Sequence, residues 1–196
     1  MKKQIFLLTS FILFMSQNTH AESLFEDKFE NPAKWTFISD SVMGGLSSGS
    51  VVYEMNEGQS IAYLSGEVTT ENNGGFIQFR RNLKEVDLKE ANYVKITAKG
   101  NNEKYYIHLR TSGTILPWQY YQSSFIVEEK YKEYVLPIKK FKKSGAFQAN
   151  TVKSRNITSI GVVAFGRDHQ ANIYVKDISF FITLFFSRYS SLILSV

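Results

Sequence analysis

The loop that decides the fold reads Ser39-Asp40-Ser41-Val42-Met43-Gly44-Gly45-Leu46-Ser47. It joins two strand-like segments, residues 35–38 and 50–55. A simple hairpin needs only the glycines, because glycine adopts the backbone conformations of tight turns without steric cost. The additional Asp40 and Met43 indicate a shaped loop with a binding surface beside it. We expect Asp40 to bond the loop amides or to pair with Arg80.

Outward from this loop, short segments alternate apolar and polar residues, as half-buried strands do. After an opening segment at 24–29 we expect roughly ten strands, with turn signals about every 8–12 residues. They cover residues 35–38, 50–55, 61–68, 76–81, 93–99, 104–110, 120–127, 132–136, 157–165 and 171–180. Only residues 86–91 and 137–147 are candidates for short helices. The pattern predicts one all-β domain, a single jelly-roll β-sandwich.

The N-terminus has the pattern of a cleaved leader. Lys2 and Lys3 precede an apolar run at 5–15, which is shorter than the roughly 20 residues that span a bilayer. Small residues lead up to a cut after Ala21, so residues 1–21 are predicted to be a signal peptide and 22–181 the domain. Its removal takes away two lysines and no acid, and the formal charge falls from +5 to +3.

Composition excludes several classes of protein. There is no cysteine, which excludes thiol enzymes and cysteine-ligated zinc. A short lysine leader without disulfides is typical of a bacterial exported protein, periplasmic or secreted. The basic residues are too dispersed for a nucleic-acid partner. One lysine cluster at 139–143 is interpreted as a solvated edge or turn, with a weak anionic-surface contact as the alternative.

The C-terminal residues 182–196 form an apolar tail of uncertain status. Arg188 and several serines argue against a spanning helix, so no firm membrane span is expected. The tail is a strand extension, a membrane-touching or partner-binding segment, or a non-native frame of translation.

No pattern in the chain calls for catalysis. Residues 45–49 match G-x-S-x-G, but a nucleophile elbow needs a helix after the serine, and a strand-like segment follows here. Ser47 is therefore assigned to a turn. His20, His108 and His169 lack metal-ligand spacing. Three acids on the first and last strand-like segments (Glu26, Asp27 and Asp177) are taken as surface acids rather than calcium ligands. We predict no enzyme, no metal and no cofactor.

The aromatic residues in the middle of the chain are more informative. Alternation places Tyr105, Ile107 and Leu109 on one face of a strand, where they form core. The other face carries a tyrosine, an imidazole and a guanidinium group (Tyr106, His108 and Arg110). With nearby Trp118 and Tyr120, this face suits a stacked sugar or an extended polar partner. The alternative is an ordinary solvated face.

Two glycine-containing motifs together carry a resemblance. The D-x-V-M-G-G-x-S motif at 40–47 and the G-G-F-x-x-x-R motif at 74–80 resemble the complex I intermediate-associated protein 30 (CIA30) domain over about residues 24–181. In this reading Phe76 anchors the second loop in the core. The resemblance also rests on Trp35, Gly100, Tyr105, Leu136, Pro137 and Phe141.

This resemblance implies a galactose-binding-like β-sandwich, related to carbohydrate-binding modules, with no catalytic residues to transfer. Mitochondrial members of the family assemble respiratory complex I, and others are fused to dinucleotide-binding domains, whose G-x-G-x-x-G this chain lacks. We expect an exported binding protein that holds a protein partner on a sandwich face or loop. The alternative is a carbohydrate-binding module. The candidate contacts are Asp40, Met43, Gly44, Gly45, Arg80, Tyr106, His108, Arg110, Trp118 and Tyr120.

Overall fold

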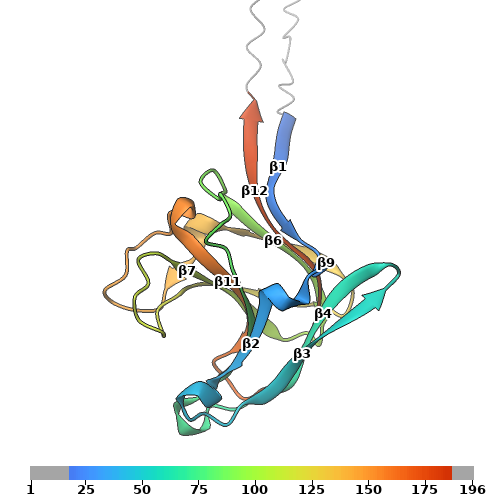
Figure 1. Cartoon of the computed structure of the whole chain (residues 1–196), viewed down its shortest axis with the longest axis vertical. Coiled ribbons are helices and arrows are strands. Elements are labelled where there is room, and N and C mark those ends of the chain that lie inside the picture. The colour runs from blue at the N-terminus through green and yellow to red at the C-terminus, as the bar shows by residue number, and fades with distance from the viewer. Residues whose placement is uncertain (1–17, 187–196) are drawn as a thin grey trace, which may run out of the picture.

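The computed structural model describes residues 18–186, and these form two six-stranded antiparallel sheets packed as a sandwich (Figure 1). The β-sandwich predicted from the strand rhythm is confirmed. Sheet A has the order β3-β4-β12-β6-β9, and β1 also pairs with β12. Its strands are β1 Asn18–Asp27, β3 Ser48–Asn56, β4 Gln59–Val68, β6 Tyr93–Gly100, β9 Lys132–Pro137 and β12 His169–Phe186.

Sheet B has the order β10-β8-β7-β11-β5-β2. Its strands are β2 Trp35–Ser39, β5 Phe76–Asn82, β7 Lys104–Thr111, β8 Tyr121–Ile126, β10 Lys142–Lys143 and β11 Ile157–Phe165. The two-residue β10 was not predicted. It lies in the lysine cluster, which is an edge of the sheet, as interpreted from the sequence.

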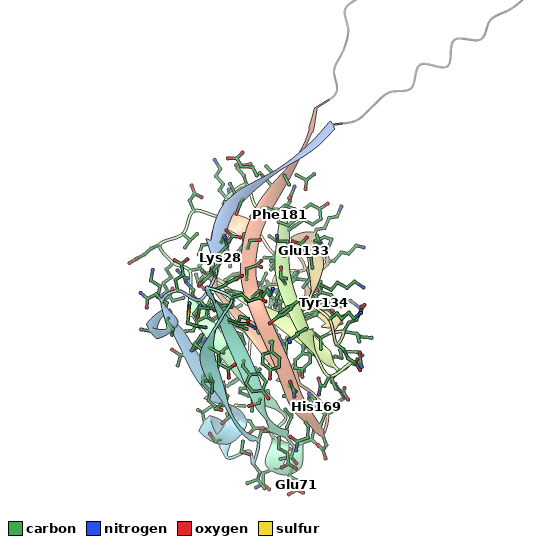
Figure 2. All side chains as sticks on the ribbon, turned by 90° about the vertical axis from the view of Figure 1, so that its right-hand side faces the viewer. Lys28, Glu71, Glu133, Tyr134, His169 and Phe181 are labelled. Atoms are coloured by element: carbon green, nitrogen blue, oxygen red, sulfur yellow. The ribbon has the colours of Figure 1, made fainter. Side chains whose placement is uncertain are left out.

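The longest strand, β12, lies at the centre of sheet A. Figure 2 shows it running from His169 to Phe181 along the length of the molecule. It pairs with β6 on one edge and with β4 and then β1 on the other. Its last part and β1 leave the sandwich as a paired arm (Figure 1). Residues 182–186 are thus a strand extension, one of the three alternatives, whereas 187–196 lie outside the described residues.

Strand β1 begins before the predicted cleavage site. Residues 18–21 pair with 183–186 of β12, and residues 22–27 pair with 178–182. Residues 1–17 lie outside the described residues, so the signal peptide stays a prediction. A cut after Ala21 would shorten β1 and leave the end of β12 without this partner.

Alternation along the strands builds the core between the sheets. Tyr105, Ile107 and Leu109 are fully buried, as predicted. Phe29, Trp35 and Phe79 pack together, with ring centroids 5.1–6.0 Å apart. Burying apolar surface of this kind is the main stabilising term for a domain without disulfides.

The predicted short helices do not form. Residues 86–91 form turns and irregular backbone, and the second segment holds η4, a 3-10 turn at Ile138–Lys140, and the short strand β10. The other 3-10 turns are η1 Pro32–Lys34, η2 Asp40–Met43, η3 Glu71–Asn73 and η5 Ser154–Asn156. Among residues 18–186, no helix has the length and hydrophobicity needed to cross a membrane.

Candidate functional site

Asp40 joins two loops that are far apart in the sequence. Its side chain is fully buried at the start of η2. One oxygen, Oδ1, accepts a hydrogen bond from the Ser47 amide at 3.0 Å. The other, Oδ2, accepts from Ser47 Oγ and the Gly75 amide, each at 2.5 Å, and from the Phe76 amide at 3.2 Å. The carboxylate therefore ties the 39–47 loop to the 71–76 loop, at the end of the sandwich opposite the β1–β12 arm (Figure 1).

The glycines of both motifs make this contact sterically feasible. A Cβ on Gly45 would lie 2.4 Å from Asp40 Cγ, and a Cβ on Gly74 would lie 2.4 Å from Asp40 Oδ2. Gly44 ends η2 with φ 84°, a left-handed conformation that side chains disfavour. Asp40, Gly44 and Gly45, predicted as contact candidates, are thus explained by the loop structure itself.

The pKa of Asp40 is the balance of two effects. Burial raises it, but the hydrogen bonds from Ser47, Gly75 and Phe76 outweigh burial and hold the pKa below its ordinary value. Asp40 is therefore a charged structural anchor. This confirms the amide-binding alternative, whereas the proposed Asp40–Arg80 brace is wrong: among the ion pairs of the described residues, neither side chain has a partner.

Next to this anchor, the outer face of sheet B is hollowed into a recess of about 740 Å³, the aromatic recess. Strands β2, β5, β7 and β11 form its floor, and the anchored loops and the β7–β8 loop form its walls. Phe76, expected in the core, is half-buried and lines this recess instead. The lining residues are Ile38, Val42, Met43, Asn73, Gly74, Phe76, Gln78, Arg80, His108, Arg110, Pro117, Trp118, Tyr120 and Phe165.

His108 and Tyr120 form a flat stack in the recess. Their ring centroids are 3.9 Å apart with an interplanar angle of 9°. Phe165 contacts His108 edge-on, and Tyr106 packs edge-on against Phe165. Burial lowers the pKa of His108 to about 3, so the imidazole is neutral at physiological pH. Its Nε2 is buried and has no hydrogen-bond partner among the described residues, which leaves a polar atom in an aromatic setting.

Trp118 is the most exposed aromatic side chain of the recess, with 61% of its surface accessible. It lies on the β7–β8 loop, which Arg110 holds in place. The Arg110 guanidinium donates hydrogen bonds to the carbonyls of Thr114 at 3.2 Å, Leu116 at 3.0 Å and Pro117 at 2.9 Å. Arg110 thus positions the wall that carries Trp118.

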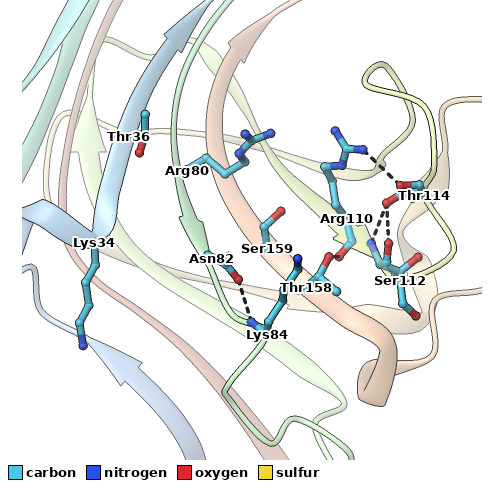
Figure 3. A pocket seen from close by; sticks show the side chains of 11 residues that line it. Lys34, Thr36, Arg80, Asn82, Lys84, Arg110, Ser112, Thr114, Thr158 and Ser159 are labelled. Atoms are coloured by element: carbon cyan, nitrogen blue, oxygen red, sulfur yellow. Dashed lines mark hydrogen bonds between the residues drawn. The ribbon is translucent and has the colours of Figure 1, made fainter.

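A second recess of about 630 Å³ is the basic recess, and Figure 3 shows the side chains that line it. Arg80 and Arg110 line both. The figure shows their side chains with Ser159 of the intervening β11 between them. The remaining lining residues are Lys34, Thr36, Asn82, Lys84, Thr111, Ser112, Thr114, Thr158 and Ser159.

The structure brings most of the predicted candidates together. Met43, Arg80, His108, Arg110, Trp118 and Tyr120 line the aromatic recess, while Tyr106 lies behind Phe165. Sequence reasoning missed Phe165, Gln78 and the lysines of the basic recess. The register of β5 and β11 pairs Phe165 with Phe76, a cross-strand neighbour that alternation alone does not identify.

Two residues that the sequence raised as a possible nucleophile and a possible metal ligand, Ser47 and Asp27, make structural contacts. The Ser47 hydroxyl is buried, donates to Asp40 and accepts from the Thr69 amide. The described residues hold no cluster of three or more histidines, cysteines or acids that suits a metal. Asp27, taken as a surface acid, is instead buried, where it accepts from Trp35 Nε1 at 2.8 Å and pairs with Arg81.

A comparison with known protein families identifies one family that matches most of the chain. The family model of complex I intermediate-associated protein 30 (CIA30) matches residues 24–174. A search of curated proteins gave no match.

Among solved structures, the family 11 carbohydrate-binding module of cellulosomal cellulase Lic26A-Cel5E of Clostridium thermocellum is similar. It has a TM-score of 0.66 at 17% identity, over 84% of this chain and 95% of the module. A family 11 module from the same organism, in complex with a β-1,3-1,4-mixed-linked tetrasaccharide, is also similar. It has a TM-score of 0.64 at 16% identity, over 82% of this chain and 94% of the module. At such identities the similarity shows the fold, and the predicted jelly roll is confirmed.

Proposed function

The chain belongs to the complex I intermediate-associated protein 30 (CIA30) family, and we propose that it is a non-catalytic binding protein that holds a saccharide in the aromatic recess. The observation that carries this proposal is the recess itself. It combines exposed Trp118 with the His108–Tyr120 stack on a rigid sheet face. Saccharide rings stack their C–H faces on aromatic rings, while their hydroxyl groups need nearby polar partners.

The polar partners are present among the lining residues. Gln78 and Asn73 offer amide groups to a ligand in the recess. The fold supports the same reading, since a family 11 module of similar fold is in complex with a mixed-linked tetrasaccharide. A saccharide is preferred to an extended peptide because Trp118 and Tyr120 supply flat surfaces.

A glycan array followed by calorimetry on the best-bound oligosaccharide tests this proposal. Trp118→Ala should weaken binding about fivefold or more, because loss of an aromatic stacking partner costs about 1–3 kcal/mol. The matched control is Phe147→Ala, since Phe147 is 97% exposed and does not line the recess. Absence of glycan binding at millimolar concentration, or equal effects of the two variants, would contradict the proposal.

A protein partner is the second candidate, and the 39–47 loop favours it. Val42, Met43 and Leu46 expose 71%, 56% and 54% of their surfaces on a loop that Asp40 holds rigid. The family description, an intermediate-associated protein, also names an association. Leu46→Asp discriminates, because Leu46 does not line the recess. If glycan binding persists in this variant while a cross-linked partner is lost, the loop is a protein contact; an unchanged cross-linking pattern argues against it.

Export of the domain is proposed from the leader pattern of residues 1–21. Cleavage after Ala21 would keep residues 22–27 of β1 paired with β12. N-terminal sequencing of protein from the cell envelope should then give Glu22 as the first residue. Recovery of a chain that starts at Met1 from the cytosolic fraction would contradict export.

A further inference from the structure

The two recesses on sheet B share two lining residues, and together they are called the groove. Arg80 of β5 and Arg110 of β7 line both of them, so they stand where the aromatic half meets the basic half. The floor between these strands is β11, where Ser159 pairs with Arg110 and Gly161 pairs with Arg80. A Cβ on Gly161 would lie 2.9 Å from Gln78 Oε1, so a larger residue would obstruct this floor. Ser159 lines the basic recess, so a small polar side chain forms the floor beside Arg110.

The groove carries positive charge without a counter-charge. The basic recess has four cationic residues, Lys34, Lys84, Arg80 and Arg110. Within residues 18–186, no aspartate or glutamate lines either recess. Lys34 extends away from the arginine pair, whereas the two guanidinium groups lie on the same side of the sheet (Figure 3). Arg80 and Arg110 are thus the cations that a ligand in the groove would meet first.

Arg80 is more buried than either lysine of the basic recess. It is half-buried, and the described part of the chain provides its guanidinium with no ion pair and no hydrogen bond. Burial lowers its pKa, and the charge of Arg110 lowers it further. Arg110 uses three of its five N–H donors on loop carbonyls, and its charge has no acidic partner among the described residues. Two like charges held together on a partly buried surface are unfavourable unless an anion lies between them.

We propose that the groove selects an acidic saccharide, with a sugar ring on the aromatic recess and a carboxylate or sulfate between Arg80 and Arg110. A guanidinium fork matches the planar pair of oxygens on such an anion, and charge-assisted bonds of this kind are the strong ones. Lys84 extends the positive field beyond the pair. The inference rests on the proposed saccharide binding, and it adds the charge class of the ligand.

Calorimetry with three tetrasaccharides of different charge tests the selection. The probes are cellotetraose, an oligogalacturonate tetramer and a sulfated galactan tetramer, which separate neutral, carboxylate and sulfate ligands. At least one acidic probe should bind tenfold or more tightly than cellotetraose, and the advantage should shrink as salt is raised. Equal affinity for neutral and acidic probes overturns the inference but leaves saccharide binding standing. If none of the three probes binds and the glycan array is also negative, both the acidic selection and the proposed saccharide binding are contradicted.

Variants locate the selecting groups. Arg80→Gln should lower the affinity for acidic probes tenfold or more, and lower the affinity for cellotetraose by a smaller factor. Arg155→Gln is the matched control, because Arg155 is exposed and lines neither recess. Lys84→Gln, at an exposed position, provides a second variant if Arg80→Gln fails to fold; it should reduce the acidic preference severalfold. An unchanged preference in both variants, or inorganic sulfate that binds at equal ionic strength while acidic saccharides do not, overturns the inference.

Discussion

Replacing Asp40 by asparagine should remove the negative charge that joins the 39–47 loop to the 71–76 loop. The carboxylate accepts four hydrogen bonds, three from amides and one from a hydroxyl. A hydrogen bond to a charged group contributes about 1.5–3 kcal/mol, so four give an upper limit of about 6–12 kcal/mol. The cost of burying the charge opposes this sum, and breaking such a buried charged network typically costs about 3–5 kcal/mol. We expect a loss in this range.

Asparagine also places an N–H₂ group, which is a donor, against the backbone N–H groups that bind Asp40. In either orientation of the amide, at least one backbone N–H of Ser47, Gly75 or Phe76 faces another donor. Because domains of this size are stable by about 5–15 kcal/mol, the variant should be marginally folded. Urea denaturation at pH 7, followed by tryptophan fluorescence, measures the difference. Trp35 is a suitable reporter because it is buried in the core.

Asp87→Asn is the control for this experiment. Asp87 is exposed and accepts one local hydrogen bond, from the Lys89 amide. Its replacement should change the unfolding free energy by less than about 0.5 kcal/mol. The reasoning is refuted if Asp40→Asn lies within about 1 kcal/mol of the wild type. Because the pKa of Asp40 is lowered on folding, its contribution is complete above the unfolded-state value of 3.8 and disappears as pH falls through the folded-state pKa.

Two further perturbations follow from the same structure. Gly45→Ala should destabilise by about 2 kcal/mol or more, because its Cβ would lie 2.4 Å from Asp40 Cγ; Gly113→Ala, whose Cβ would meet nothing closer than 3.7 Å, should be near neutral in the same urea assay. His108 is buried neutral with a pKa of about 3 against an ordinary 6.5, so wild-type stability should fall as pH is lowered from 6.5 towards 3. His108→Phe should flatten this loss in unfolding measurements at pH 7 and 4.5, and an equally steep loss in the variant would show that His108 does not cause it.

The strands could be read from the sequence because each half-buried strand alternates. Tyr105, Ile107 and Leu109 show this most clearly, since all three are fully buried on one face of β7. The misses occur where alternation fails. Strand β10 consists of two lysines, and the end of β12 is apolar on both faces, so neither has a period that marks a strand or its end.

Only part of the candidate site could be predicted from the sequence. The sequence predicted that Asp40 bonds the amides of its own loop, but not that it binds the Gly75 amide, which is 35 residues away. The basic recess was not predicted, since Lys34 precedes β2 and Lys84 follows β5, and only the sheet order makes these segments neighbours. The face that carries His108 and Arg110 was predicted correctly, because it depends on alternation within one strand.

The central claim is that the outer face of sheet B binds a saccharide, and an amide and indole NMR titration tests it most directly. With the best array oligosaccharide, the largest shifts should fall on the Trp118 indole N–H and on amides around Gly74, Arg80 and Tyr120, which line the groove. Amides of β3 and β9, on the edges of sheet A, should not move. Shifts that gather on sheet A, or none at saturating oligosaccharide, would contradict the account.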